Sequence, residues 1–360
     1  MRLPMPSDNV MRSLKKGVAI PALPLALDKD KRLDEKYQAA LFQYYFHSGA
    51  GGVAVGVHTT QFEIREPEYK LFEPVLQLGA DVMAKLSEKR ESPFIRIAGI
   101  CGKTFQAVKE AEFASSLGYD IGLLSLGALR EADEDELIRH CEEAAKIIPL
   151  MGFYLQPKVG GRKLSHAFWR RFFEIENVVA VKMAPFNRYM TLDVVRALAL
   201  SGREKEITLY TGNDDNIVVD LLTPYRIETP AGEKLIRIRG GLLGQWSVWT
   251  EKAVEMLREI HVIIDDKQEI PQELLAKAVA LTDANAAIFD AANDFAGCIS
   301  GINEILRLQG LLEYSHCLSE TERLSPGQAA EIQRVRREYP FLTDDDFVRE
   351  HLSEWLEGGL

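Results

Sequence analysis

A lysine at the end of an apolar run is the residue whose setting most clearly suggests chemistry. Lys182 follows Val178-Val179-Ala180-Val181, a short β-branched segment typical of a strand that is buried on both faces. Lysine is rarely buried without a partner, and burial disfavours its charged form, which leaves a nucleophilic amine. Such an amine can form a Schiff base with a carbonyl substrate. The alternative is a lysine that extends from the strand end into solvent.

A tyrosine closes the preceding apolar run. Tyr154 lies at the end of 151–154, and the run that contains Lys182 is the next strand-like segment. A phenol that faces an amine across adjacent strand ends could move protons to and from the carbinolamine oxygen. The alternative is a core aromatic whose hydroxyl bonds a backbone carbonyl.

Polar loops follow two other predicted strands. The loop after the second strand contains Gly56, His58, Thr59 and Thr60. Hydroxyls and backbone N–H groups in a tight, glycine-led turn can bind a carboxylate, so the loop is a candidate substrate-binding segment. The alternative is a polar loop without a ligand.

The loop after the seventh strand contains Gly212 and Asn213, which we also expect to bind substrate because of their position at a strand end. Asp214 and Asp215 follow. Adjacent carboxylates that open a helix usually cap it, and no histidine or carboxylate set with metal-ligand spacing accompanies them. We therefore expect no metal and no cofactor.

The elements that must position these residues alternate along the chain. Eight short apolar runs are separated mostly by amphipathic segments of helical period, such as 33–47, 104–117 and 134–148. Repeated strand–helix units predict parallel strands, and eight of them predict closure into a (β/α)8 TIM barrel. An open doubly wound sheet is the competitor, but no G-x-G-x-x-G follows the first strand. The predicted strands cover 18–23, 52–55, 94–98, 121–124, 151–154, 178–182, 207–210 and 241–248.

Two segments depart from this repeat. Residues 225–229 and 234–238 alternate in type around Pro230-Ala231-Gly232-Glu233, which predicts a β-hairpin inserted near 225–238. Beyond about residue 265 the strands stop, and helical patterns follow at 271–294, 301–312, 326–338 and 344–356. We therefore expect a barrel over 1–265 and a C-terminal helical region over 266–360, which serves assembly or covers apolar barrel surface.

Composition narrows the classes of function. The chain has 360 residues, of which 46% are hydrophobic, and a net charge of −11 with no basic stripe, which excludes a typical nucleic-acid binder. No segment is long and apolar enough to span a bilayer, and residues 1–6 lack the apolar core of a signal peptide. The four cysteines are far apart, as expected for reduced thiols in the cytoplasm.

The tyrosine and the lysine together resemble the catalytic pair of the dihydrodipicolinate synthase / N-acetylneuraminate lyase family. In that family a tyrosine in a Y-x-x-P segment precedes the Schiff-base lysine by 28 positions, and Tyr154 and Lys182 have the same separation. The resemblance covers roughly residues 15–315. Segments that agree with the family lie at 49–53 with Gly56, 118–120, His140, 211–214 and 241–247.

The resemblance implies a (β/α)8 barrel with a helical C-terminal region, usually a homotetramer. It also implies a class I aldolase mechanism, in which Lys182 condenses with pyruvate or another 2-oxo acid and Tyr154 relays the proton. The imine then stabilises a neighbouring carbanion without a metal. The partners would be the 2-oxo acid, an aldehyde, and further copies of this chain.

The segments that recognise the substrate depart from the family. The G-x-x-G-E loop, whose hydroxyl and amide groups bind the oxo-acid carboxylate, reads Gly56-Val57-His58-Thr59-Thr60 here. The P-Y-Y segment reads Gly127-Ala128-Leu129, and Val159 replaces an arginine, with Lys158 and Arg162 nearby. We therefore do not expect authentic dihydrodipicolinate synthase activity. Three functions stay open: a lyase or aldolase, a dehydratase or hydratase-aldolase that uses the same imine, and a catalytically silent ligand-binding barrel.

Overall fold

The computed structural model describes residues 3–358 and divides the chain into two compact units. Unit 1 comprises the chain up to Val18 together with Ile95–Leu242, and unit 2 comprises Ala19–Phe94 together with the chain from Leu243 onward. Each unit is therefore built from two separate stretches of sequence. None of the helices within residues 3–358 is long and apolar enough to cross a membrane.

The described residues contain eight strands of a parallel sheet that alternate with helices, which is the predicted (β/α)8 barrel fold. In unit 1 the order is β10-β7-β6-β5-β4-β3, with parallel ladders between neighbours. In unit 2, β1 and β2 are joined by the parallel bridge between Ala22 and Ala54. The strands are β1 (Ala19–Pro21), β2 (Gly52–Val55), β3 (Ile95–Ile100), β4 (Ile121–Leu124), β5 (Leu150–Leu155), β6 (Val178–Ala184), β7 (Thr208–Thr211) and β10 (Ile238–Leu243).

Three helices that follow strands of unit 1, at 134–145, 166–172 and 188–201, begin at polar caps. The side chains of Asp133, Ser165 and Asn187 accept hydrogen bonds from the backbone N–H three residues on, at 2.8, 3.0 and 3.1 Å. Each cap satisfies one donor that the first helical turn leaves unpaired. The helices are α1 (Asp8–Lys16), α4 (Thr104–Ser116), α5 (Glu134–Ala145), α6 (His166–Phe172), α7 (Arg188–Ser201) and α8 (Ile217–Leu222), with 3₁₀ turns at Gly127–Leu129 and Pro157–Val159.

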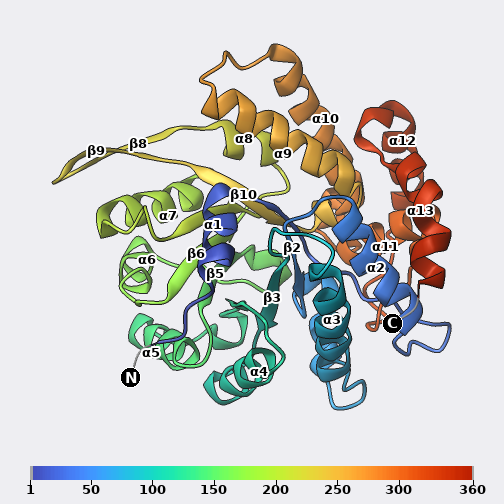
Figure 1. Cartoon of the computed structure of the whole chain (residues 1–360), viewed down its shortest axis with the longest axis horizontal. Coiled ribbons are helices and arrows are strands. Elements are labelled where there is room, and N and C mark those ends of the chain that lie inside the picture. The colour runs from blue at the N-terminus through green and yellow to red at the C-terminus, as the bar shows by residue number, and fades with distance from the viewer. Residues whose placement is uncertain (1–2, 359–360) are drawn as a thin grey trace. The chain divides into compact units, whose positions relative to one another are not determined.

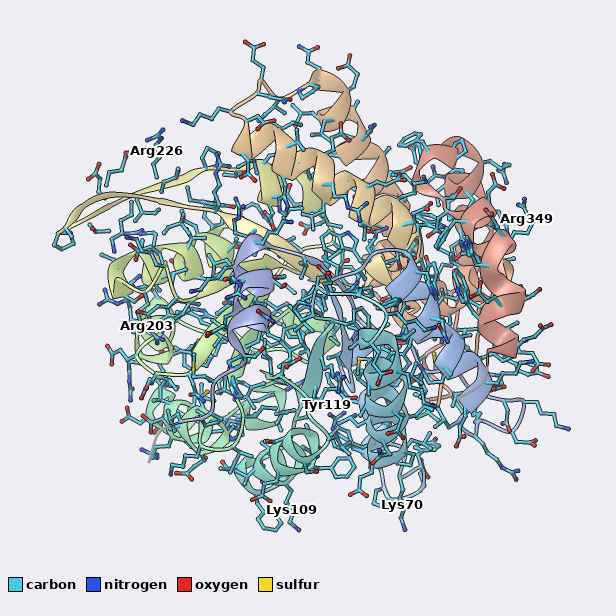
Figure 2. All side chains as sticks on the ribbon, in the orientation of Figure 1. Lys70, Lys109, Tyr119, Arg203, Arg226 and Arg349 are labelled. Atoms are coloured by element: carbon cyan, nitrogen blue, oxygen red, sulfur yellow. The ribbon has the colours of Figure 1, made fainter. Side chains whose placement is uncertain are left out.

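The predicted hairpin is confirmed in unit 1. Strands β8 (Tyr225–Thr229) and β9 (Gly232–Ile236) pair antiparallel, and the ribbon extends along α7 in Figure 1. The second strand begins two residues before the predicted 234–238, because Pro230 and Ala231 alone form the turn. Arg226 projects from the hairpin (Figure 2) and pairs with Glu233 at 2.7 Å across the two strands.

Unit 2 contains the predicted C-terminal helices, coloured orange to red in Figure 1. The predicted helix 271–294 is shorter than expected, since it ends at Ile288 and a 3₁₀ turn follows at Ala291–Asn293. The domain boundary at 265/266 stays a prediction. The helices are α2 (Glu35–His47), α3 (Phe72–Ser87), α9 (Thr250–Asp265), α10 (Gln272–Ile288), α11 (Cys298–Gln309), α12 (Gln328–Glu338) and α13 (Asp345–Glu357), with 3₁₀ turns at His58–Thr60, Phe62–Arg65, Gln245–Ser247 and Pro340–Leu342.

A buried carboxylate ties α13 to three other helices of unit 2. Asp344, which precedes α13, is 2% exposed and accepts hydrogen bonds from the Tyr44 hydroxyl at 2.7 Å and the Gln309 side-chain amide at 2.8 Å. It also accepts the backbone N–H of Glu251 at 3.2 Å. Burial raises the pKa of Asp344 from 3.8 to about 6, and the hydrogen bonds act in the opposite direction.

This raised pKa predicts a pH dependence of stability. The folded chain binds the Asp344 proton more tightly than the unfolded chain, so this group stabilises the fold most below pH 4. Its contribution is lost as the pH rises to 6, a change of roughly 2 kcal/mol in the free energy of unfolding. Urea unfolding between pH 4 and pH 7 measures how the free energy of unfolding changes with pH. In Asp344→Asn the part of this change that is due to Asp344 should be absent. If the free energy of unfolding of Asp344→Asn depends on pH as strongly as that of the unaltered chain, other groups cause the dependence.

Candidate functional site

Lys182 lies inside β6 and is buried, with 7% of the residue exposed. The sequence predicted this lysine at the end of its strand. The strand continues through Met183 and Ala184, so Lys182 lies two residues before the end. Register partners in parallel strands share a face of the sheet. Phe153 on β5 and Tyr210 on β7 are the partners of Lys182. The Lys182 Nζ atom lies 4.5 Å from the centre of the Phe153 ring, which stabilises a cation at this position.

Gly212 provides the space for this lysine. A Cβ atom at Gly212 would lie 2.8 Å from Lys182 Cε and 2.8 Å from the Cβ of Ala184. Any larger residue would therefore displace the aliphatic part of the lysine. The structure brings Gly212 and Lys182 together, and it gives the glycine a packing role beside the amine.

Tyr154 points away from Lys182. Its register partner is Met183, so its side chain lies on the opposite face of the sheet from the amine. Its hydroxyl donates to the carbonyl of Leu164 and accepts the Leu164 N–H, both at 3.2 Å, and its ring packs 5.4 Å from that of Trp169 on α6. Burial raises the pKa of Tyr154. This arrangement matches the alternative of a core aromatic, and the proton relay stays a prediction.

The separation of 28 residues could not reveal this orientation. Side chains alternate between the two faces of a strand, so a shift of one residue exchanges them. The ladder between β5 and β6 contains such an irregularity between Leu150 and Met151. As a result Phe153, and not Tyr154, shares the face of Lys182.

Asn213 connects the loops that follow β6 and β7. Its side-chain carbonyl accepts the N–H of Phe186 at 3.0 Å, and its amide donates to Asp220 at 2.8 Å and to Thr191 at 3.3 Å. Phe186 has a φ of +50°, which is uncommon for a bulky residue. The buried Asn213 therefore fixes the loop that follows the lysine strand.

Asp220 is a residue that the sequence reasoning missed. It is completely buried and accepts the Thr211 hydroxyl at 2.7 Å and the side-chain amides of Asn213 and Asn216 at 2.8 and 3.0 Å. It also forms an ion pair with Arg188. The sequence signal was a single acid in the apolar run Ile217–Leu222. A buried charge with four donors organises this side of the site.

The predicted carboxylate-binding loop belongs to unit 2 and is a tight turn. Gly56 has a φ of +73°, and the Thr60 hydroxyl accepts the N–H of Gly56 at 3.0 Å and donates to the carbonyl of Leu23 at 2.7 Å. The Thr60 hydroxyl thus supports the turn itself. Thr59 is 4% exposed, and the His58 ring lies 5.7 Å from the Phe62 ring in an edge-on contact.

Arg65 is a second residue that the sequence reasoning missed. It donates to the carbonyl of Gly56 at 3.0 Å, and its guanidinium lies 4.5 Å above the ring of Phe72. The arginine follows the loop by five residues, so no motif pointed to it. It places a cation next to the predicted carboxylate-binding turn.

Within residues 3–358 no group of three or more histidine, cysteine or acidic side chains is arranged to hold a metal ion. The predicted site residues are divided between the units: Gly56, His58, Thr59 and Thr60 belong to unit 2, and Tyr154, Lys182, Gly212 and Asn213 to unit 1. Unit 1 thus contains the candidate nucleophile and the glycine that gives it room.

Comparison with known proteins places the fold. No family model matches the sequence, and no curated protein matches it. Solved structures match over nearly the whole chain. Dihydrodipicolinate synthase from Acinetobacter baumannii, in a complex with pyruvate, has a TM-score of 0.72 and 18% identity, and the match covers 90% of this chain and 99% of that one. The chain has the dihydrodipicolinate synthase fold.

Two other solved structures extend this likeness. N-acetylneuraminate lyase from Fusobacterium nucleatum has a TM-score of 0.69 and 16% identity, covering 90% of this chain and 99% of that chain. A prophage protein of the dihydrodipicolinic acid synthase family from E. coli K12, in a complex with pyruvate, has a TM-score of 0.70 and 16% identity, covering 90% and 98%. At these identities the likeness shows the fold, so the resemblance predicted from the sequence is confirmed at that level.

Proposed function

We propose that this chain is a Schiff-base-forming lyase or aldolase that acts on pyruvate or another 2-oxo acid. The observation that carries the proposal is the buried Lys182, which lies in a barrel strand beside Gly212 with its amine above the Phe153 ring. Solved structures with the same fold include complexes with pyruvate. A buried lysine in such a strand is suited to attack a carbonyl carbon.

The proposed reaction proceeds through an imine on Lys182. The neutral amine attacks the C2 carbonyl carbon of the 2-oxo acid, and the resulting carbinolamine loses water to give a protonated imine. This imine accepts the electron pair that remains on C3 when a C–C bond breaks, or when a C3 proton leaves. In the first case the C4 hydroxyl loses its proton and an aldehyde departs, which leaves an enamine. A proton then adds to C3 of the enamine and restores the imine. Hydrolysis of the imine then releases the 2-oxo acid and regenerates the amine, and the Phe153 ring stabilises the cationic states.

Borohydride trapping tests this proposal. The whole chain is incubated with pyruvate, 2-oxobutyrate or 2-oxoglutarate, reduced with borohydride, and digested for mass spectrometry. We expect a stable secondary amine on the peptide that contains Lys182 with at least one of these acids. An unmodified Lys182 with all of them would refute the proposal. Product analysis distinguishes aldol cleavage from the dehydratase or hydratase-aldolase alternative, and trapping without turnover would indicate a silent binding barrel.

Replacing Tyr154 distinguishes a structural role of its hydroxyl from a role as the proton relay. In the structure its hydroxyl supports the Leu164 backbone, so Tyr154→Phe should lower the free energy of unfolding by about 1–3 kcal/mol and leave the trapped adduct intact. A catalytic relay would instead lower kcat by about 100-fold or more at unchanged stability. Urea unfolding and turnover measured on the same variant separate the two results. The second result would restore Tyr154 as the proton relay.

We further propose that the loop of Gly56, His58, Thr59 and Thr60 binds the substrate carboxylate through its N–H groups and His58. The cation of Arg65 beside the turn supports this role. His58→Gln should raise KM for the oxo acid by about tenfold, with a smaller change in kcat, because a binding interaction is lost. Equal KM values for the variant and the unaltered chain would show that His58 does not bind the substrate.

The partners in this proposal are an aldehyde and further copies of the chain in a dimer or tetramer. Light scattering measures the assembly, and a mass equal to that of one chain, 40.5 kDa, would exclude it.

A further inference from the structure

A cavity lies in unit 1, at the opposite ends of the strands from the candidate nucleophile. It has a volume of about 280 Å³. Its lining residues come from the last turn of α1, from α7 and the connection to the start of β7, and from the end of β9 through the start of β10. Thr208, which begins β7, lines this cavity, whereas Gly212, beside Lys182, follows the end of the same strand. The two sites are therefore separate.

The cavity is strongly cationic in a chain with a net charge of −11. Four of its side chains carry positive charge, and Glu204 is the acid among the residues that line it. Glu204 is already paired, because it accepts a hydrogen bond from Lys234 at 2.9 Å. The net positive charge of the lining favours an anion with at least two charges. The cationic residues are Lys15, Lys205, Arg237 and Arg239.

The protein holds these cations in place. Gly17, which ends α1, has a φ of +89°, and a Cβ atom there would lie 1.9 Å from the carbonyl oxygen of Arg239. Only glycine permits this close approach of α1 to β10. The Tyr210 hydroxyl also donates to the carbonyl of Leu14 at 2.9 Å, and Arg237 donates to the carbonyl of Leu222 at 3.1 Å. Lys15, Arg237 and Arg239 thus belong to a fixed backbone frame.

The remaining lining indicates the shape of the ligand. Leu198, Ile207, Leu235 and Ile236 form an apolar part of the wall, and Leu235, on the hairpin, is 53% exposed. Guanidinium groups bind phosphate and carboxylate through two parallel hydrogen bonds. A cavity of this size accommodates a small molecule with one anionic end and a short apolar part.

We propose that this cavity is a binding site for a small organic dianion, either a phosphate monoester or a dicarboxylate. The inserted hairpin then has a role, since β9 supplies one wall and Arg237, which connects β9 to β10, supplies one of the cations. The site is independent of the Schiff-base chemistry proposed for Lys182.

Calorimetric titration of the whole chain tests this proposal. The probes are phenyl phosphate and phthalate, with benzyl alcohol as the uncharged control. We expect saturable binding of one or both anions, weakening as sodium chloride rises from about 50 to about 500 mM because exposed charges are screened. Binding of phenyl phosphate alone or of phthalate alone identifies the head group. Absence of binding by both, or equal binding of benzyl alcohol, would overturn the proposal.

Matched variants locate the binding. Lys15→Gln with Lys205→Gln removes two exposed cations of the cavity and should weaken binding by about tenfold or more. Lys36→Gln with Lys109→Gln makes the same change in net charge at exposed positions that do not line the cavity, and should leave binding unchanged. Lys182→Met should also bind normally. Loss of binding in Lys182→Met, or equal weakening in both double variants, would refute the proposed site.

Discussion

Replacing Lys182 with methionine is expected to abolish the borohydride-trapped adduct and to reduce turnover of the 2-oxo acid by roughly 10⁴-fold or more, because the proposed imine forms on the amine that the substitution removes. Methionine matches the length of the apolar part of lysine and suits the buried surroundings of β6. The fold should therefore persist, and urea unfolding of the variant checks this. The measurement is mass spectrometry of the reduced protein together with turnover of the same sample.

Lys109→Met serves as the matched control. Lys109 is an exposed lysine on α4, labelled in Figure 2, whose amine lies above the Phe105 ring at 4.4 Å. It too pairs a lysine with an aromatic ring, but on the surface. Its replacement should change neither the adduct nor turnover. An adduct that persists in Lys182→Met would exclude Lys182 as the nucleophile.

Replacing Asp220 with asparagine is expected to destabilise the protein by roughly 2–4 kcal/mol, because a buried charge is lost while its donors remain. The amide of asparagine would direct N–H groups at the Thr211 hydroxyl and the Asn213 amide, which are themselves donors. Asn213 also holds the backbone of Phe186 after β6. Imine formation at Lys182 should therefore slow in the same variant. Urea unfolding measures the stability, and the rate of trapping measures the effect on the site.

Asp215→Asn is the control for this effect. Asp215 pairs with the same arginine, Arg188, at a longer distance of 3.5 Å, and the side chains of both residues are well exposed, at 44% and 40%. An exposed ion pair contributes about 0–1 kcal/mol. Equal destabilisation by the two substitutions would show that the buried donors around Asp220 do not matter.

The order and kind of the elements could be predicted from the sequence because apolar periodicity reports burial directly. All eight barrel strands overlap their predicted ranges, and the hairpin and the C-terminal helices are present. The boundaries differ by a few residues, because apolar periodicity does not mark the exact residue at which a strand ends. For example, β10 ends at Leu243, whereas Gln245–Ser247, expected within the strand, forms a 3₁₀ turn.

The candidate site could be predicted less completely, since chemistry depends on which face a side chain occupies. Lys182 was predicted from the apolar run that precedes it, which indicates a buried strand. The orientation of Tyr154 depends on one irregularity in the ladder between β5 and β6, which no sequence pattern records. Asp220 and Arg65 lack a motif, because their roles arise from contacts that exist only after folding.

The contact between Asp344 and Tyr44 has a consequence for biosynthesis. These two residues are separated by 300 positions in the chain, yet their side chains share one buried hydrogen bond. Helix α2 emerges from the ribosome early. The aromatic surface that it packs against α13 stays uncovered until α13 has been synthesised. Contacts this distant in sequence form late, and exposed apolar surface in the interval favours aggregation. A nascent chain stalled before residue 344 should therefore depend on chaperones that bind apolar segments.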